Sequence, residues 1–258
     1  MNQDWSPERY DAFATARQRP TADLIAGVPE TTTDHITDLG CGSGLSTLLL
    51  AQRWPQAQIS GVDRSPAMLA QAKERVPAAR FVEADIAAYT SERAQDLIVA
   101  NASLHWLDHH SSLMPRLVQN LRSGGTFAVQ MPDNLDQPSH TLMDDVAREA
   151  AFASALRKIP GRRAPLSDPE TYYDILAPHC RCVDIFSITY RHRLKGAEAI
   201  ADFFATTGLK PYLDPLDAPL RESFLRQYEA RLRAAYPQRV DGSVLLSLPR
   251  LFIIAIRS

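Results

Sequence analysis

Three glycines at alternate positions, Gly40, Gly42 and Gly44, interrupt the stretch ITDLGCGSGLSTLLL. A glycine-rich turn between a strand and a helix lets a ligand approach the main chain more closely than a side chain would permit. The dinucleotide pattern G-x-G-x-x-G would need its third glycine at Leu45 or Thr47, depending on the register, and neither position has one. The residues therefore predict a ligand-binding turn that differs from the usual dinucleotide loop.

Polar side chains stand where the following predicted strands end. Asp63 ends QISGVD, and its carboxylate can accept hydrogen bonds from both ribose hydroxyls of a nucleoside. Asp85 lies at the end of a third strand in VEADI, where it either binds a ligand or only caps a turn. Asn101 ends a fourth strand and opens ANASLHWL. The spacing predicts a nucleoside site, and Asp63 alone does not say which cofactor fills it.

The elements that would position these side chains alternate along residues 35–131, where short apolar strands are separated by helical patterns. This alternation is typical of a parallel sheet covered by helices. Ser65 and Pro66 are suited to the cap and the first position of a helix after the second strand. The predicted strands are HITDL, QISGVD, ARFVEAD, DLIVAN and TFAVQM.

Composition narrows the class of protein. Hydrophobic residues make up 45% of the 258 residues, enough to bury a sizeable core. Lys plus Arg (28) nearly balance Asp plus Glu (30), so no global field favours nucleic acid or an anionic membrane. The longest apolar runs, such as LFIIAI, are too short to span a bilayer, and we expect a cytoplasmic protein. Cys180 and Cys182 form a lone C-x-C, so we expect reduced thiols and no metal site.

The segment D-L-G-C-G-S-G resembles motif I of the class I S-adenosylmethionine (SAM) methyltransferases. The resemblance implies that the glycine turn runs under the ribose and methionine parts of SAM, that Asp85 and the amide of Ile86 read the adenine, and that Asn101 lies near the sulfonium. Asp38 would hold the methionine end. The implied cofactor-binding residues are Asp38, Gly40, Cys41, Gly42, Gly44, Asp63, Arg64, Asp85, Ile86 and Asn101.

A narrower resemblance extends over the whole chain. From DWSPERYDAFATARQRPTADLIA through GVDRSPAMLAQA, FVEADI, VQMPDN, YYDIL and TTGLKPYL to LPRLFI, the sequence resembles the trans-aconitate 2-methyltransferase family. It departs from that family at Ser43, where proline is frequent, and at His105, where glutamine is frequent. The implied fold is a Rossmann-like, doubly wound, mostly parallel seven-stranded sheet with helical cap insertions.

The resemblance also implies the reaction, which is methyl transfer from SAM to one carboxylate of trans-aconitate, giving a monomethyl ester and S-adenosylhomocysteine. A carboxylic acid with a pKa of about 4 is ionised at neutral pH, so the nucleophile needs no general base. Catalysis is then alignment of the carboxylate with the methyl group and the sulfur. We therefore expect no catalytic residue in the strict sense and no metal.

Four segments are expected. They are an N-terminal helical lid over residues 1–30, the SAM-binding core over 31–132, a helical insertion forming a substrate cap over 133–180, and residues 181–258, which complete the sheet with strands near 182–193 and 249–257 and carry a helical insertion at 196–237. The lid is implied by the resemblance, because an N-terminal helix covers SAM in relatives.

Recognition of a tricarboxylate favours planar arginines that bind carboxylates through two hydrogen bonds, supported by tyrosine, histidine and amide donors. The preferred candidates are Arg162, Arg163 and Tyr172, and the further ones are His140, Arg17, Arg19 and Arg250. His105 and Trp106 follow the fourth strand, where acceptor-facing side chains are common in this superfamily, although Trp106 would equally pack under the helix at residues 110–121.

Other functions stay open at this point. The same fold would serve another small acceptor, such as a different polycarboxylate or a phenol, and a phenol would require a nearby base. A noncatalytic SAM-binding protein would keep the cofactor residues without turnover. An NAD-linked dehydrogenase is disfavoured by the missing third glycine. We expect a monomer whose partner is a small molecule, without nucleic acid or membrane.

Overall fold

The computed structural model describes residues 14–30, 33–159, 163–205 and 207–258, with the backbone alone for residues 14–17. The chain forms two compact units. The described residues up to Pro132, together with Leu166–Ile188 and Arg250–Ser258, form the first unit. Residues Asp133–Pro165 and Thr189–Pro249 form the second unit.

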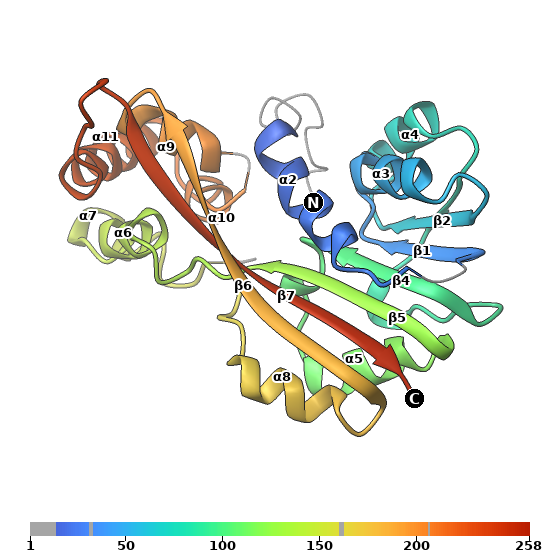
Figure 1. Cartoon of the computed structure of the whole chain (residues 1–258). Coiled ribbons are helices and arrows are strands. Elements are labelled where there is room, and N and C mark those ends of the chain that lie inside the picture. The colour runs from blue at the N-terminus through green and yellow to red at the C-terminus, as the bar shows by residue number, and fades with distance from the viewer. Residues whose placement is uncertain (1–13, 31–32, 160–162, 206) are drawn as a thin grey trace. The chain divides into compact units, whose positions relative to one another are not determined.

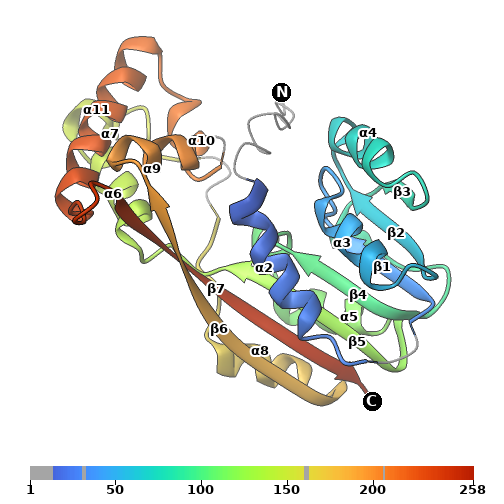
Figure 2. The ribbon, with the colours of Figure 1, turned by 45° about the horizontal axis from the view of Figure 1, so that its top comes forward.

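The described residues form a seven-stranded sheet with the order β3-β2-β1-β4-β5-β7-β6 (Figures 1 and 2). Strands β1 to β5 pair in parallel, and β7 runs antiparallel to β5. The mostly parallel seven-stranded sheet expected from the sequence is confirmed. The strands are β1 His35–Leu39, β2 Gln58–Asp63, β3 Arg80–Glu83, β4 Gln95–Asn101, β5 Leu121–Pro132, β6 Cys180–Leu194 and β7 Val244–Arg257.

Helices cover both faces of the sheet in the first unit (Figures 1 and 2). One face carries α2 Ala14–Ala26, α3 Leu45–Arg53 and α4 Pro66–Arg75, and the other carries α5 His110–Val118 and α8 Pro169–Leu176. The start of α4 follows the predicted signal, since the Ser65 hydroxyl accepts a hydrogen bond from the Met68 amide at 3.3 Å. Single turns of 3-10 helix, η1 Ile86–Ala88 and η2 Leu104–Trp106, follow β3 and β4.

Alternate residues of β5 serve the two faces of the sheet. Phe127, Val129 and Met131 are fully buried in the core that also contains Leu117 of α5 and Leu176 of α8. Successive side chains of a strand point to opposite faces, so the intervening residues of β5 face the side covered by α2. Helix α2 packs directly on β5 and β4.

The second unit combines helices with the last residues of β6 and the first residues of β7. The helices are α6 Pro138–Ala147, α7 Ala150–Ala153, α9 Ala197–Phe204, α10 Lys210–Leu213 and α11 Ala218–Ala235. Helix α11 packs on α6, α7 and α9. Two tyrosines near its end fasten it to α6, since the Tyr228 hydroxyl donates to the Ser139 carbonyl at 2.7 Å and the Tyr236 hydroxyl accepts from the Ser139 amide at 3.0 Å. Helix α8 lies in the first unit, although the sequence analysis assigned residues 133–180 to one insertion.

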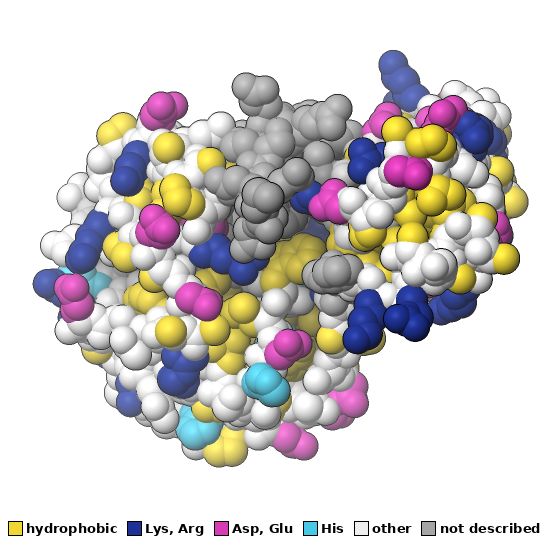
Figure 3. Space-filling view, turned by 180° about the vertical axis from the view of Figure 1, so that it is seen from behind, with side chains coloured by type: hydrophobic (Ala, Val, Ile, Leu, Met, Phe, Trp, Pro, Cys, Tyr) yellow, Lys and Arg dark blue, Asp and Glu magenta, His cyan; other side chains and the backbone are white. Residues whose placement is uncertain are grey.

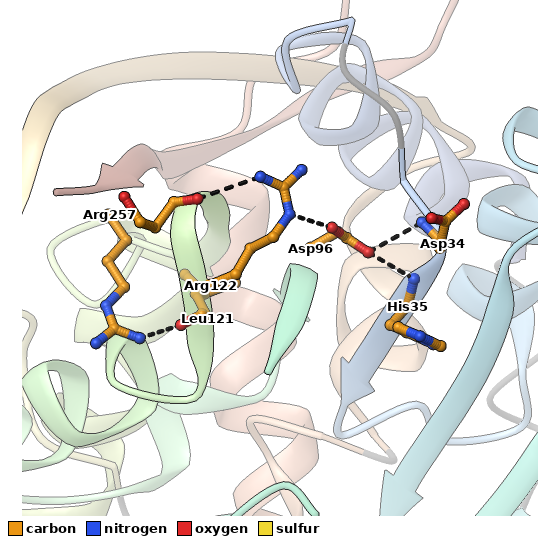
Figure 4. Close-up of polar contacts among 7 residues, drawn as sticks. Asp34, His35, Asp96, Leu121, Arg122 and Arg257 are labelled. Carbon is orange, nitrogen blue, oxygen red and sulfur yellow. Dashed lines mark hydrogen bonds and ion pairs between the residues drawn. The ribbon is translucent and has the colours of Figure 1, made fainter. Parts of the chain in front are cut away.

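The amino ends of β1 and β4 are joined by one carboxylate (Figure 4). Asp96 Oδ2 accepts the backbone amides of Asp34 at 3.0 Å and His35 at 2.8 Å, while Oδ1 pairs with the guanidinium of Arg122. Partial burial opposes ionisation, but these hydrogen bonds outweigh it and lower the pKa of Asp96. Nearby, Arg257 donates to carbonyl groups at the start of β5. These contacts lie at the amino ends of the strands, whereas the glycine turn follows the carboxyl end of β1.

Basic and acidic side chains are interspersed over the face drawn in Figure 3. None of the helices in the described part of the chain combines the length and hydrophobicity needed to cross a membrane. All three cysteines are described and free, with Cys41 and Cys180 buried and Cys182 exposed. Burial raises the pKa of Cys180 to about 11.

Candidate active site

The glycine turn joins β1 to α3, and all three of its glycines have positive φ angles. A Cβ on Gly40 would lie 2.3 Å from the Cβ of Ser103, and one on Gly44 would lie 3.0 Å from the Cα of Ala72. A Cβ on Gly42 would meet no atom within 4 Å. Gly40 and Gly44 are therefore needed for close packing of the chain itself, whereas Gly42 opens the main chain to a ligand.

Asp38 ends β1 directly before the turn and is fully buried. Its Oδ2 accepts the hydroxyls of Ser46 at 2.7 Å and Thr47 at 2.6 Å, both from the first turn of α3. Its Oδ1 is buried and has no hydrogen-bond partner among the described residues. Burial, aided by the charge of Asp63, raises the pKa of Asp38 to about 6. A buried carboxylate oxygen without a donor is costly, so this atom fits a cationic or N–H group of a ligand.

Asp63 links the turn to the next helix. Its Oδ2 accepts the Gly42 amide at 2.9 Å, and its Oδ1 accepts the Ser65 amide at 2.9 Å. A carboxylate has about four acceptor positions, so both oxygens keep capacity for hydroxyl donors. Asp63, from which we expect ribose binding, therefore also fixes the conformation of the glycine turn.

In the segment after β3, Asp85 caps a turn, and this contact is compatible with a further role in ligand binding. Asp85 is exposed, and its Oδ1 accepts the Ala87 amide at 2.8 Å at the start of η1. Ile86 packs partly against the core, and its Cδ1 lies 3.3 Å from the position of a Cβ on Gly40. The predicted adenine segment therefore lies beside the glycine turn. Arg64, at the end of β2, is exposed.

Cys41 lies inside the turn with only 4% of its surface exposed. Its thiol is 3.8 Å from the Gly42 carbonyl. Burial, followed by the negative charges of Asp38 and Asp63, raises the pKa of this thiol far above its usual range. The thiol therefore stays protonated at neutral pH and has no nucleophilic role.

Asn101 ends β4 and contacts helix α2. Its Nδ2 donates to the Thr21 hydroxyl at 2.8 Å, while its Oδ1 is buried with no partner among the described residues. The next residue, Ala102, has a φ of 51°, a left-handed conformation that costs about 1 kcal/mol for a residue with a Cβ. Thr21 therefore holds the carboxamide so that its acceptor atom stays available. Nothing in the sequence indicated this role of Thr21.

Gln130 is the second polar residue that the sequence analysis missed. It is the register partner of Asn101 on the neighbouring strand β5, so the two side chains lie on the same face of the sheet. It is fully buried, and neither amide atom has a hydrogen-bond partner among the described residues. The sequence signal for a buried polar residue at this position is the single amide within the apolar run TFAVQM.

The structure brings some acceptor candidates to the same edge of the first unit. His105 is buried in η2 with its ring centroid 4.9 Å from that of Trp106, which is 41% exposed. Arg250 is half-buried on β7 and is the register partner of Pro132, two residues beyond Gln130. All three positions follow or flank the carboxyl ends of β4 and β5.

Other candidates lie elsewhere. Tyr172 of α8 is fully buried, and its hydroxyl is 2.8 Å from His110 Nδ1, so the structure gives it a packing position in the core. Arg19 is largely exposed and pairs with Asp23 at 3.8 Å. In the second unit, His140 packs edge-on against Phe204, with ring centroids 4.7 Å apart.

Arg163, also in the second unit, donates to the side chain of Asn134. Arg162 lies outside the described residues, as do the side chain of Arg17 and the first half of the predicted lid.

Comparison with known proteins agrees with this geometry. The model of a family described as "Methyltransferase domain" matches residues 36–125. The chain is 49% identical over 255 residues to a trans-aconitate 2-methyltransferase of Acidovorax ebreus, covering 99% of both chains. It is 48% identical over 254 residues to one of Afipia carboxidovorans, covering 98% of this chain and 99% of the other.

Among solved structures, the YcgJ protein of Bacillus subtilis superposes with a TM-score of 0.61 at 14% identity, covering 93% of this chain and 98% of the other, which shows likeness of fold. The near-half identity over the full length of the curated relatives shows more than fold. By this measure the chain belongs to the trans-aconitate 2-methyltransferase family.

Proposed function

We propose that this protein transfers the methyl group of SAM to one carboxylate of trans-aconitate, releasing the monomethyl ester and S-adenosylhomocysteine. The observation that carries the proposal is the 49% identity to a relative named trans-aconitate 2-methyltransferase, of which the alignment covers 99%. The site supports it, because Asp38, Asn101 and Gly42 each leave a polar atom or an open backbone position that SAM would fill.

We expect different cofactor-binding residues to bind different parts of SAM. Asp38 Oδ1 would hold the ammonium of the methionine part, directly or through water, and the open main chain at Gly42 would hold the ribose. Asp63 accepts the ribose hydroxyls while it holds the turn through the Gly42 amide. Asp85 and the amide of Ile86 take the adenine. Gly40, Cys41, Gly44 and Arg64 complete this set.

Positioning and electrostatics are enough for the reaction. When bound, SAM would supply an electrophilic methyl group to a carboxylate oxygen, and its sulfur would keep the electron pair of the broken carbon–sulfur bond. The Oδ1 atom of Asn101, fixed by Thr21, presents partial negative charge to the cationic centre without accepting a proton. No side chain has to remove a proton, because the acceptor is ionised at neutral pH.

The acceptor side needs cationic and donor groups that hold two carboxylates while the third reacts. In the first unit, the candidates for this role are Arg250, His105 and Trp106. The other candidates are Arg17 and Arg19 of the N-terminal segment and His140, Arg162 and Arg163 of the second unit. The proposal includes a lid role for the N-terminal segment and a substrate-binding role for residues 133–180. The protein acts in the cytoplasm as a monomer, with a small molecule as its partner.

The test is initial-rate methyl transfer from labelled SAM to trans-aconitate, with cis-aconitate, isocitrate and citrate measured in parallel. The proposal expects the highest kcat/KM with trans-aconitate. An Arg250→Ala variant should raise KM for the acceptor with little change in SAM affinity, and an Arg162→Ala plus Arg163→Ala variant tests the second unit in the same way. Tight SAM binding without turnover on any acid would contradict the proposal and favour a noncatalytic SAM-binding protein.

A further inference from the structure

Two amide side chains lie near the carboxyl ends of neighbouring strands beneath α2. Asn101 of β4 and Gln130 of β5 are register partners, and they share the face of the sheet that carries Asp38 of β1. Asn101 donates from Nδ2 to the Thr21 hydroxyl, and its Oδ1 has no hydrogen-bond partner among the described residues. Gln130 leaves both its donor and its acceptor without a partner among the described residues, although it is fully buried.

An unpaired buried amide is unusual because it loses its hydrogen bonds to water and gains none in the protein. Gln95, at the opposite end of β4, shows the ordinary arrangement. Its Oε1 accepts the Thr37 hydroxyl at 3.0 Å, and its Nε2 donates to the Arg93 carbonyl at 2.8 Å. An apolar side chain of similar size would fill the position of Gln130 better in the absence of a ligand.

The chemistry of the neighbouring groups indicates what satisfies Gln130. The Oδ1 atom of Asn101 is an acceptor and therefore suits a cation. A ligand group that accepts hydrogen bonds would then lie on the other side of Asn101 from Asp38, towards β5 and β7. Arg250 lies on that side, because it is opposite Pro132, two residues beyond Gln130 and on the same face. A donor amide and a guanidinium on adjacent strands suit a carboxylate.

We propose that Gln130 is an acceptor-binding residue whose Nε2 donates to a carboxylate oxygen of the acceptor beside the methyl-transfer position. This inference rests on the proposed function, since it assumes a carboxylate acceptor. The amide has no exposed surface in the ligand-free chain, so the acceptor enters beside Asn101 and the Gln130 side chain turns towards it. Gln130 thereby distinguishes a carboxylate acceptor from an apolar one of the same size.

The test compares Gln130→Met with Gln95→Met as the matched control. Both replace a buried glutamine on this sheet by an apolar side chain of similar length. Acceptor KM and kcat are measured with trans-aconitate, SAM affinity is measured by calorimetry, and the melting temperature is measured without ligand. A second variant, Gln130→Glu, keeps the shape and replaces the donor by an anion at pH 8.

Gln130→Met should raise KM for trans-aconitate about tenfold or more, the effect of losing a hydrogen bond to a charged group. Its SAM affinity should change less than twofold, and its melting temperature should not fall. Gln130→Glu should raise the acceptor KM at least as much. Gln95→Met should melt at a lower temperature with unchanged KM, because it breaks two made hydrogen bonds.

An unchanged acceptor KM in both Gln130 variants, with the wild type active, would overturn the inference and leave the proposed function intact. A loss of SAM affinity equal to the rise in KM would also overturn it, by assigning the amide to the cofactor. Failure of the wild type to methylate trans-aconitate would overturn the proposed function itself, and the inference with it. The wild-type rate therefore separates the two failures.

Discussion

The different surroundings of the three glycines make Gly42→Ala the sharpest test of the cofactor site. A Cβ on Gly42 meets nothing within 4 Å in the ligand-free chain, although φ is 51°. The substitution therefore costs the protein only the strain of a left-handed alanine, about 1–2 kcal/mol. For a chain of this size, that loss lowers the melting temperature by about 2–8 °C.

Two further variants calibrate this effect. Gly242, in the turn before β7 of the second unit, has a φ of 75° and open space around a Cβ, so Gly242→Ala carries the same backbone cost away from the glycine turn. Gly40→Ala adds a clash, since its Cβ would lie 2.3 Å from that of Ser103. Overpacking of that kind costs about 1–3 kcal/mol more, so this variant should melt lowest.

Calorimetric titration with SAM, after melting curves have shown that the variants fold, gives the decisive comparison. Gly42→Ala should bind SAM at least about tenfold more weakly, because a methyl group would occupy the space the cofactor needs. Gly242→Ala should melt at a similar temperature and bind SAM like the wild type. Equal SAM affinity in Gly42→Ala and Gly242→Ala would refute the claim that the cofactor contacts the main chain at Gly42.

Three further predictions use buried polar groups. The folded pKa of Asp38, about 6, lies above its ordinary value of 3.8, so the ionised group destabilises the ligand-free fold above pH 6, by about 3 kcal/mol. Asp38→Asn should therefore raise the melting temperature at pH 8, lose this advantage as the pH falls through 6, and bind SAM more weakly; equal SAM affinity would count against its ligand role. Asp96 has a lowered pKa, so its carboxylate stabilises the fold above pH 4 and the benefit is lost at more acid pH. Asp96→Asn should cost about 1–3 kcal/mol in urea unfolding at pH 7, with unchanged turnover. Tyr172→Phe should cost about 0.5–1.5 kcal/mol through the lost contact with His110 and leave the acceptor KM unchanged, whereas a raised KM would return Tyr172 to the acceptor site.

The limits of the first two strands could be predicted closely because local signals coincide there. HITDL and QISGVD are the observed β1 and β2. Apolar runs define each strand, and glycine or a serine–proline cap ends it, so pattern and turn chemistry agree. The same signals placed Asp38, Asp63 and Asn101 at strand ends, where the structure has them.

The side-chain partners could not be predicted, because they depend on register and packing between distant segments. Thr21 meets Asn101 across 80 positions of sequence, and Gln130 joins them only through the pairing of β4 with β5. Tyr172 had the residue type of a substrate ligand, yet its helix α8 lies against α5 and buries the ring. Spacing along the chain carries no information about such contacts.

Product analysis after incubation of the protein with methyl-deuterated SAM and trans-aconitate tests the central claim most directly. The protein should form a deuteriomethyl monoester of trans-aconitate and S-adenosylhomocysteine in equal amounts, detected by mass spectrometry. Formation of S-adenosylhomocysteine without the ester, or no product while SAM remains bound, would contradict it.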